Sequence, residues 1–453
     1  MINLFEYQNK QEFKGQFSEL EDFLDSIWKR REKNDFYLDE ESDRIEIQQF
    51  LQFLHKTNEL KSNKYVGVIH FQGESINLLP KIFFKQGKEY FHSDIQAIQN
   101  HILWWLSYCR KIKFPNYQTS LGSLKNNFFE ILIYLFSKYT RELLTYSIYQ
   151  QYVEENREIA FIKGRLNTGK YISENIAKGN WHKLNCTYDS FNIDNKFNRI
   201  IKYVSTLLYN ETQNSESKKY LREILFILDE VSDEKAKAEE CRVIQFNQSF
   251  SKFETVRDYC FLFLRSCISV EYKNNLKLFA FILPMEYVFE DFIFGFIEKE
   301  IKNTSAESQV KKYLDQGEKF NLKPDLYINT GSRNIIADTK YKIIYTDDSD
   351  PKNGISQSDL YQMIAYAIRF DINEIKLFYP DTIRGYNEKE DEIIIKDELA
   401  KGLKINIKTF QLPIINHRLF SAFIEEELEL TKMFELTKTN LKERLMNIIS
   451  QAN

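Results

Sequence analysis

The chain has 453 residues, of which 62 are basic and 66 acidic, so its net charge is close to zero. This balance excludes an overall electrostatic footprint for nucleic acid, and any contact with DNA must come from a local patch or from a partner. Tyr and Phe are abundant while Gly and Pro are scarce, which argues against long disordered stretches. A chain of this length is expected to form two or three domains.

The pattern of cysteines and the absence of long apolar runs indicate the cellular location of the chain. The cysteines are scattered, odd in number and contain no Cys-x-x-Cys pair, so we expect reduced thiols in cores and a cytoplasmic location: Cys109, Cys186, Cys241, Cys260 and Cys267. The first residues lack the apolar core of a targeting segment. The most apolar runs, 259–270 and 278–285, are shorter than the roughly 20 residues of a membrane span. We therefore expect no membrane contact.

Residues 1–115 are predicted to form an N-terminal α+β domain. Apolar runs over 65–72 and 76–84 are separated by a short turn at Gly73, a pattern that indicates a β-hairpin. Ser93 is the predicted N-cap of a helix over 94–109, which contains two consecutive tryptophans.

Residues 116–271 are predicted to form a largely helical central region, with helices over 124–155, 194–210 and 215–240. The string from Gly164 to Tyr171 nearly matches the P-loop pattern G-x-x-x-x-G-K-[ST]. Tyr171 stands where a Ser or Thr hydroxyl would contact magnesium, so we expect that this chain itself binds no nucleotide. Arg165 and Lys170 are instead expected to form a basic turn that meets a partner or a phosphate backbone.

Residues 272–453 carry the pattern with the clearest chemistry, Pro324-Asp325 followed by Asp338-Thr339-Lys340. A strand from the proline, a turn at 331–332 and a strand from 334 predict a hairpin on which Asp338 and Lys340 share a face. Two carboxylates supply the hard oxygen ligands of Mg²⁺ or Mn²⁺, and a lysine beside an attacking water completes a site for phosphodiester hydrolysis. A solvated hairpin with alternating charge is the alternative interpretation of the same string.

Two flanking helices favour the nuclease interpretation. Upstream, apolar residues at 285, 288, 289, 292, 293 and 296 predict a helix, with Glu290 beside its apolar stripe. Downstream, a helix over 358–370 places Gln362 and Tyr366 four residues apart on one face. In this order the elements resemble the PD-(D/E)xK nucleases, and the Gln-x-x-x-Tyr pair resembles their RecB-like branch. That resemblance implies that Glu290 is an additional metal ligand and that Gln362 and Tyr366 contact substrate or support the site.

Further strings resemble the McrC family, the nuclease subunits of McrBC-type modification-dependent restriction systems. They are 76–82, 163–166, 186–199, 285–290, 324–325, 338–342 and 361–366. The resemblance implies a multidomain α/β protein, in which a mixed α+β docking region precedes an α/β/α nuclease domain with a mixed sheet at 272–453. Charged insertions around 211–240 and 346–357 depart from the family pattern.

The same resemblance implies a division of labour between two proteins. This chain would be a Mg²⁺- or Mn²⁺-dependent endonuclease that cuts double-stranded DNA in antiviral defence, with Asp325, Asp338 and Lys340 as its catalytic residues. It would dock on an AAA+ GTPase ring resembling McrB, and stimulate that ring, through Arg165, Lys170 and Arg199.

Two alternatives remain open: a stand-alone repair or end-processing nuclease of RecB type, and a non-catalytic activator of an AAA+ motor. The 270 preceding residues argue against the first, and the intact acidic pair with its lysine argues against the second.

Overall fold

A computed structural model describes residues 2–30, 50–71, 74–109, 128–272, 276–302, 304–308, 310, 312–313, 321–331, 333–344, 352, 355–385, 390–396, 404–420 and 430–450. The chain forms two compact units. The first unit joins Met1–Ile131 with Ser266–Asn453, and the second is Leu132–Arg265. The first unit is therefore built from both ends of the chain. The second unit lies within the central region predicted for residues 116–271.

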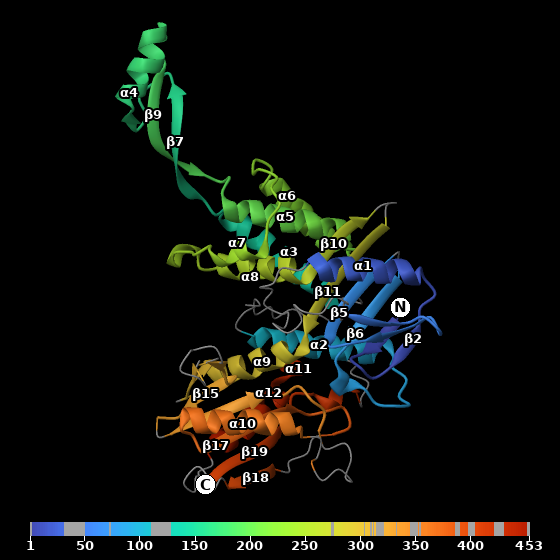
Figure 1. Ribbon diagram of the computed structural model, residues 1–453. Coiled ribbons are helices and arrows are strands. Elements are labelled where there is room, and N and C mark those ends of the chain that lie inside the picture. Colours follow the sequence, from blue (N-terminus) through green and yellow to red (C-terminus); the bar gives the residue numbers. More distant parts are fainter. Residues whose placement is uncertain are drawn as a thin grey trace. The chain divides into compact units, whose positions relative to one another are not determined.

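The first unit contains a five-stranded sheet whose strands come from both chain segments (Figure 1). Their order is β1 (Ile2–Phe5), β6 (Glu74–Leu79), β5 (Tyr65–Phe71), β11 (Leu276–Pro284) and β10 (Cys267–Tyr272). β1 pairs with β6 in parallel, and the other pairs are antiparallel. The predicted hairpin is thus confirmed as β5–β6. β6 ends at Leu79 because the following Pro80 has no N–H to donate to a neighbouring strand.

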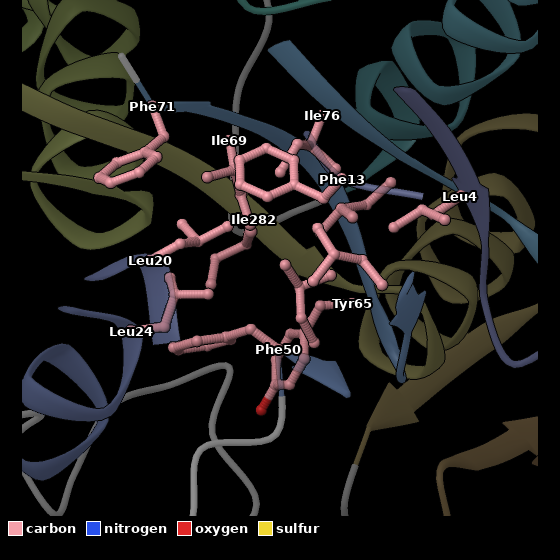
Figure 2. Packing of buried hydrophobic residues seen from close by; sticks show 13 residues of the cluster. Leu4, Phe13, Leu20, Leu24, Phe50, Tyr65, Ile69, Phe71, Ile76 and Ile282 are labelled. Carbon is pink, nitrogen blue, oxygen red and sulfur yellow. The ribbon is translucent and has the colours of Figure 1, made fainter. Parts of the chain in front are cut away.

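The main core of this sheet lies beneath α1 (Phe17–Arg30) and beside a small sheet of β2 (Lys10–Glu12), β4 (Glu59–Ser62) and β3 (Leu51–Leu54). Figure 2 shows how side chains from these elements converge, among them Leu20 and Leu24 of α1, Tyr65 and Ile69 of β5, and Ile282 of β11. Every member of this cluster is at most 8% exposed. Residues more than 200 positions apart therefore share one core.

The same unit contains a six-stranded mixed sheet. Its order is β12 (Ser305–Ser308), β15 (Leu326–Asn329), β16 (Asn334–Thr339), β17 (Glu374–Pro380), β19 (Lys404–Leu412) and β18 (Glu390–Lys396). β15 and β16 form the predicted antiparallel hairpin, whereas β16, β17 and β19 run parallel. A short pair of β13 (Lys312–Tyr313) and β14 (Asn321–Leu322) lies apart from it. The predicted mixed α/β architecture is confirmed.

Helices cover the six-stranded sheet on both faces, as the alternating direction of the side chains in β17 shows. Ile375, Leu377 and Tyr379 pack with residues of α10 (Gln357–Phe370), a helix that the sequence predicts. The intervening Lys376 points to the opposite face, where its ammonium donates to the carbonyl of Ile448 in α12 (Glu435–Ser450). α9 (Met285–Glu300) confirms the other predicted helix. A short α11 (Leu430–Met433) precedes α12.

The second unit joins helices to a long hairpin. Its helices are α3 (Phe128–Tyr146), α4 (Thr168–Lys170), α5 (Lys196–Glu211), α6 (Ser215–Ile227), α7 (Ala238–Arg242) and α8 (Phe253–Ser266). β7 (Gln151–Ile159) and β9 (Leu184–Asn192) pair over nine residues each, and β8 (Arg165–Leu166) joins β9. α4 lies at the end of this hairpin that is remote from α5 and α6 (Figure 1).

Several predicted element boundaries are wrong. The helix expected over 124–155 ends at Tyr146, and 151–159 form β7 instead. Most described side chains of β7 are exposed, so the strand lacks the alternating apolar pattern that would have revealed it. The helix expected over 215–240 is divided into α6 and α7. α2 (His92–Tyr108) begins one residue before Ser93, and Phe91 occupies the N-cap position. The insertion around 346–357 lies largely outside the described residues.

Gly67 of β5 provides a test of the five-stranded sheet. A Cβ at this position would lie 1.9 Å from the carbonyl oxygen of Phe281 on β11, and the φ angle is +146°. Gly67→Ala should therefore destabilise the first unit by roughly 2 to 4 kcal/mol in denaturant unfolding. Gly87→Ala is the matched control, since φ is +77° there but no atom lies within 4 Å, and it should cost about 1 kcal/mol. Equal losses in both variants would contradict this account.

Candidate functional site

The β15–β16 hairpin places two carboxylates opposite each other. Leu326 pairs with Ala337, and continuing this antiparallel register by one residue brings Asp325 opposite Asp338. Oδ2 of Asp325 accepts hydrogen bonds from the backbone N–H and the hydroxyl of Thr339, at 2.8 and 2.7 Å. These two bonds fix the Asp325 carboxylate against β16. The structure thus brings together the two acidic residues that the sequence pattern selected.

Lys340 lies between this acidic pair and α10. Its Nζ is 2.5 Å from Oδ2 of Asp338, whose side chain is 1% exposed. The same Nζ donates to Oε1 of Gln362 at 3.1 Å. The Lys340 backbone is also held, because its N–H donates to the carbonyl of Phe378 on β17 at 2.8 Å. The lysine therefore faces the carboxylates from a fixed backbone position.

Gln362 and Tyr366 extend this contact chain along α10. Nε2 of Gln362 donates to the Tyr366 hydroxyl at 2.7 Å, and that hydroxyl donates to the carbonyl of Lys323 at 3.1 Å. Lys323 directly precedes Pro324, so the chain of contacts returns to the start of β15. Asp325, Asp338, Lys340, Gln362 and Tyr366 form one connected cluster, which we call the acidic cluster.

Two supporting contacts of the acidic cluster were not predicted. The first is the pair of bonds from Thr339 to Asp325 described above. The second is the ion pair of Lys342 with Asp359, in which Nζ lies 2.7 and 2.9 Å from the two carboxylate oxygens. Asp359 is buried near the start of α10, so this pair fixes the helix that carries Gln362. The spacing of Lys342, two residues after Lys340, was the available sequence signal.

Burial shifts the acid–base behaviour of the acidic cluster. Burial, and then the neighbouring Asp325, raise the pKa of the Asp338 carboxyl to about 7, although Lys340 opposes this change. Burial also raises the pKa of Asp325, against the influence of Lys340 and Thr339. The pKa of Lys340 is raised, because its carboxylate neighbours outweigh the effect of burial. A site that holds one buried and one half-buried carboxylate with a single lysine has excess negative charge when both carboxylates are ionised.

The donor set fits a hard divalent cation. Oδ1 of the buried Asp338 has no hydrogen-bond partner among the described residues, while Oδ2 is paired with the Lys340 ammonium. Buried carboxylate oxygens without such partners are energetically costly. Mg²⁺ typically binds one or two protein carboxylates and completes its shell with water and substrate phosphates. Asp325 and Asp338 are the residues that would hold it.

Glu290 lies half-buried on α9. Burial raises the pKa of the Tyr366 phenol first, and then Asp338, Asp325 and, more weakly, Glu290 raise it further. Glu290 therefore raises the pKa of the same Tyr366 hydroxyl as the acidic pair does. Within the described ranges, however, no three His, Cys, Asp or Glu side chains are grouped closely enough to hold a metal ion. Metal ligation by Glu290 stays a prediction.

The predicted docking residues lie in the second unit and differ in their surroundings. Arg165 and Lys170 are exposed, in β8 and α4 at the end of the β7–β9 hairpin. Arg199 is instead held within its own unit by Asp194, at 2.7 and 3.0 Å, and by Glu234 at 3.0 Å. Arg199 thereby stabilises the start of α5, whose N-cap is Asn195.

Gly164 explains part of the P-loop-like string in structural terms. Its φ angle is +69°, and a Cβ would lie 2.4 Å from the carbonyl oxygen of Thr187 on β9. The preceding Lys163 ammonium lies 3.9 Å from the centroid of the Tyr188 ring. This glycine is therefore required for the close approach of the turn to β9.

These features define a class, namely multidomain mixed α/β proteins with an acidic pair and a lysine where two adjacent strands of a mixed sheet meet, at the start of β15 and the end of β16. More specifically, the chain belongs to the family described as McrBC 5-methylcytosine restriction system component, which matches residues 60–380. No helix in the described part of the chain is long and apolar enough to cross a membrane. Four of the five cysteines are described as buried free thiols, as expected.

The fold is also similar to solved structures. One is described as a refined half-complex from a tetradecameric assembly of Thermococcus gammatolerans McrB AAA+ hexamers with bound McrC. It matches with a TM-score of 0.65 and 18% identity, over 99% of both chains. A cryo-EM structure of the Thermococcus gammatolerans McrBC complex matches with a TM-score of 0.49 and 18% identity, over 66% of this chain and 88% of the other. No curated protein matches the sequence.

Asp338→Asn should reveal the cost of burying the Asp338 carboxylate beside Asp325. The pKa of Asp338 is raised in the folded state, so the folded chain retains a proton that the unfolded chain releases between about pH 4 and pH 7. Folding stability therefore decreases as pH rises through this window, and the variant lacks that loss. We expect the melting temperature of Asp338→Asn to rise relative to the unsubstituted chain between pH 5 and pH 8, measured with a chelator present.

The matched control for this prediction is Asp371→Asn. Asp371 is exposed at the end of α10 with a φ angle of +59°, a conformation that Asn tolerates as well as Asp does. The control should follow the unsubstituted chain across the pH range. A parallel pH response of Asp338→Asn and Asp371→Asn would show that the acidic pair carries no such cost.

Proposed function

We propose that this chain is the metal-dependent endonuclease subunit of a GTP-driven restriction complex and that it cleaves phosphodiester bonds of double-stranded DNA. The observation that carries the proposal is the acidic cluster, in which five residues of a PD-(D/E)xK pattern lie in contact. Membership of the McrBC family supports the restriction context. The order of β15, β16 and α10, with α9 upstream, supports a PD-(D/E)xK domain with Mg²⁺ or Mn²⁺ as cofactor.

Each residue of the acidic cluster has a chemical task in this proposal. Asp325 and Asp338 hold the cation, with Glu290 as a third acidic group. The bound cation stabilises negative charge on the phosphate and lowers the pKa of an attacking water. Lys340 orients and stabilises that water beside the scissile phosphate. Gln362 holds the Lys340 ammonium in place, and Tyr366 fixes Gln362 through its bond to the backbone of Lys323.

The proposed partner is an AAA+ GTPase ring resembling McrB, because the structural relative is described in complex with McrB AAA+ hexamers. In the second unit, the end of the β7–β9 hairpin exposes basic and apolar side chains together. Phe161 is 65% and Trp181 70% exposed, beside Arg165 and Lys170. Such a surface fits docking on an acidic surface of the ring. GTP would then bind to the partner rather than to this chain.

The nuclease proposal predicts a selective loss in the reconstituted complex with GTP and Mg²⁺. Asp325→Ala, Asp338→Ala and Lys340→Ala should each lower the DNA cleavage rate by at least about 100-fold. Stimulation of the partner's GTP hydrolysis should persist, because these residues lie in the first unit and act on the phosphate. Asp371→Asn and Lys302→Ala, at exposed positions of the same unit, are the controls and should cut normally.

The outcomes of this assay separate the alternatives. Normal cutting by Asp338→Ala would refute the site assignment. Absence of cleavage by the unsubstituted chain, with intact GTPase stimulation, would indicate a non-catalytic activator. Cleavage without partner or GTP would favour a stand-alone repair nuclease.

Docking through the hairpin end gives a second prediction. The double substitution Arg165→Ala with Lys170→Ala should weaken binding to the partner by about tenfold. Binding is measured by adding increasing amounts of the chain to a constant concentration of the partner and following the rate of GTP hydrolysis. The loss should shrink at high salt, since exposed charges are then screened. Lys219→Ala on α6 is the control with an exposed lysine of the same unit. Undiminished stimulation by the double variant would exclude these residues from docking.

A further inference from the structure

A turn from the N-terminal part of the chain contacts the residue that follows Lys340. Lys81 begins the 3₁₀ turn η2 (Lys81–Phe83) directly after β6. Its ammonium lies 4.6 Å from the ring centroid of Tyr341. Tyr341 is only 3% exposed, and the ring of Phe289 from α9 lies 6.0 Å away. A cation at this distance from an aromatic face is attracted to it, more strongly where water is excluded.

Glu6 holds this turn through a hydrogen bond between its side chain and the backbone of the turn. Its side chain is 1% exposed, and it accepts a hydrogen bond from the backbone N–H of Lys81 at 3.1 Å. Its own N–H donates to the carbonyl of Leu79 at 2.9 Å, which continues the pairing of β1 with β6. Burial raises the pKa of Tyr341, and the nearby Glu6 carboxylate raises it further. Glu6, Lys81 and Tyr341 therefore form one contact group, which we call the Lys81 group.

The same turn contacts the segment that follows β17 of the six-stranded sheet. The carbonyl of Ile82 accepts a hydrogen bond from the N–H of Ile383 at 2.9 Å, three residues after the end of β17. β17 also accepts the Lys340 N–H at Phe378. The turn therefore contacts the segments that follow β16 and β17. Lys340 directly follows the first of these strands, and its N–H donates to the second.

A tight turn links Tyr341 to Lys340. The N–H of Lys342 donates to the carbonyl of Lys340 at 2.8 Å, so Tyr341 is the central residue of a three-residue turn that begins at Lys340. The Lys340 side chain contacts Gln362 of α10, while the Tyr341 ring contacts Lys81, so both side chains anchor the same turn. A shift of the Tyr341 ring would move the Lys340 Cα, and misplacement of a catalytic group by about 1 Å can lower a rate about 100-fold.

We propose that Lys81, held by Glu6, is a positioning residue for phosphodiester cleavage, because its contact with the Tyr341 ring fixes the place of Lys340. This inference rests on the proposed nuclease function. It assigns a role in cleavage to the first two segments of the five-stranded sheet, residues 2–6 and 74–83, which contribute no residue to the acidic cluster.

The test uses the full chain with its GTPase partner. Lys81→Met retains the aliphatic stem but removes the cation, and it should lower the single-turnover cleavage rate about 10- to 100-fold at saturating partner and DNA. GTPase stimulation should stay unchanged. Lys81→Arg should restore most of the rate, because guanidinium also packs on aromatic rings. Tyr341→Leu should resemble Lys81→Met, whereas Tyr341→Phe keeps the ring and should cut well. Lys85→Met, at an exposed lysine near the same turn, is the control.

A second readout requires neither metal nor DNA. The Lys340 side chain is 18% exposed and should therefore react slowly with an acetylating reagent, as measured by mass spectrometry of its peptide. Lys81→Met should increase that labelling rate severalfold in the metal-free chain, and Lys85→Met should not. A purely structural role would instead lower the melting temperature and leave the relative labelling of Lys340 unchanged.

The outcomes separate this inference from the proposed function. If Asp338→Ala is inactive but Lys81→Met cuts and labels like the unsubstituted chain, the positioning role is refuted while the nuclease function stands. If the unsubstituted chain does not cut, the nuclease function fails first. Loss of folding in both Lys81→Met and Tyr341→Leu would also count against positioning, since the Lys81 group would then serve stability.

Discussion

The close approach of two carboxylates, the half-buried Asp325 and the buried Asp338, is the constraint on which the rest of the first unit depends. Burial raises the pKa of Asp338, and repulsion from the neighbouring Asp325 carboxylate raises it further. The pair persists because several independent contacts hold the two carboxylates in place. Thr339 fixes one carboxylate, Lys340 faces the other, and the hairpin register leaves neither strand free to slide.

The rigidity of this site comes from distant parts of the sequence. The indole N–H of Trp105 in α2 donates to the carbonyl of Ile414, which follows β19. His101, one turn earlier in the same helix, accepts a hydrogen bond from the N–H of Asn416. The backbone N–H of Ile414 also donates to the buried Asp381 at the end of β17. The N-terminal segment is therefore part of the scaffold that holds the six-stranded sheet.

The two units differ in how their side chains are stabilised. The first unit contains a buried carboxylate that its neighbours stabilise, whereas the β7–β9 hairpin of the second unit exposes aromatic side chains and is stabilised by polar contacts. Asn175, which is 2% exposed, donates to Glu158 and accepts from Asn185, so the hairpin end is ordered with few apolar contacts. Exposed aromatic and basic residues on an ordered support are the composition of a protein-binding surface.

The sequence by itself determined the hairpin of β15 and β16, the helices α9 and α10, and the five residues of the acidic cluster. Period-two and helical spacing are local properties, and together they set which side chains share a face. Only the tertiary structure decided that Arg199 is held by Asp194 and Glu234, that 151–159 form a strand, and that Lys81 reaches Tyr341. Those outcomes depend on partners far away in sequence, and no local periodicity encodes which distant surfaces meet.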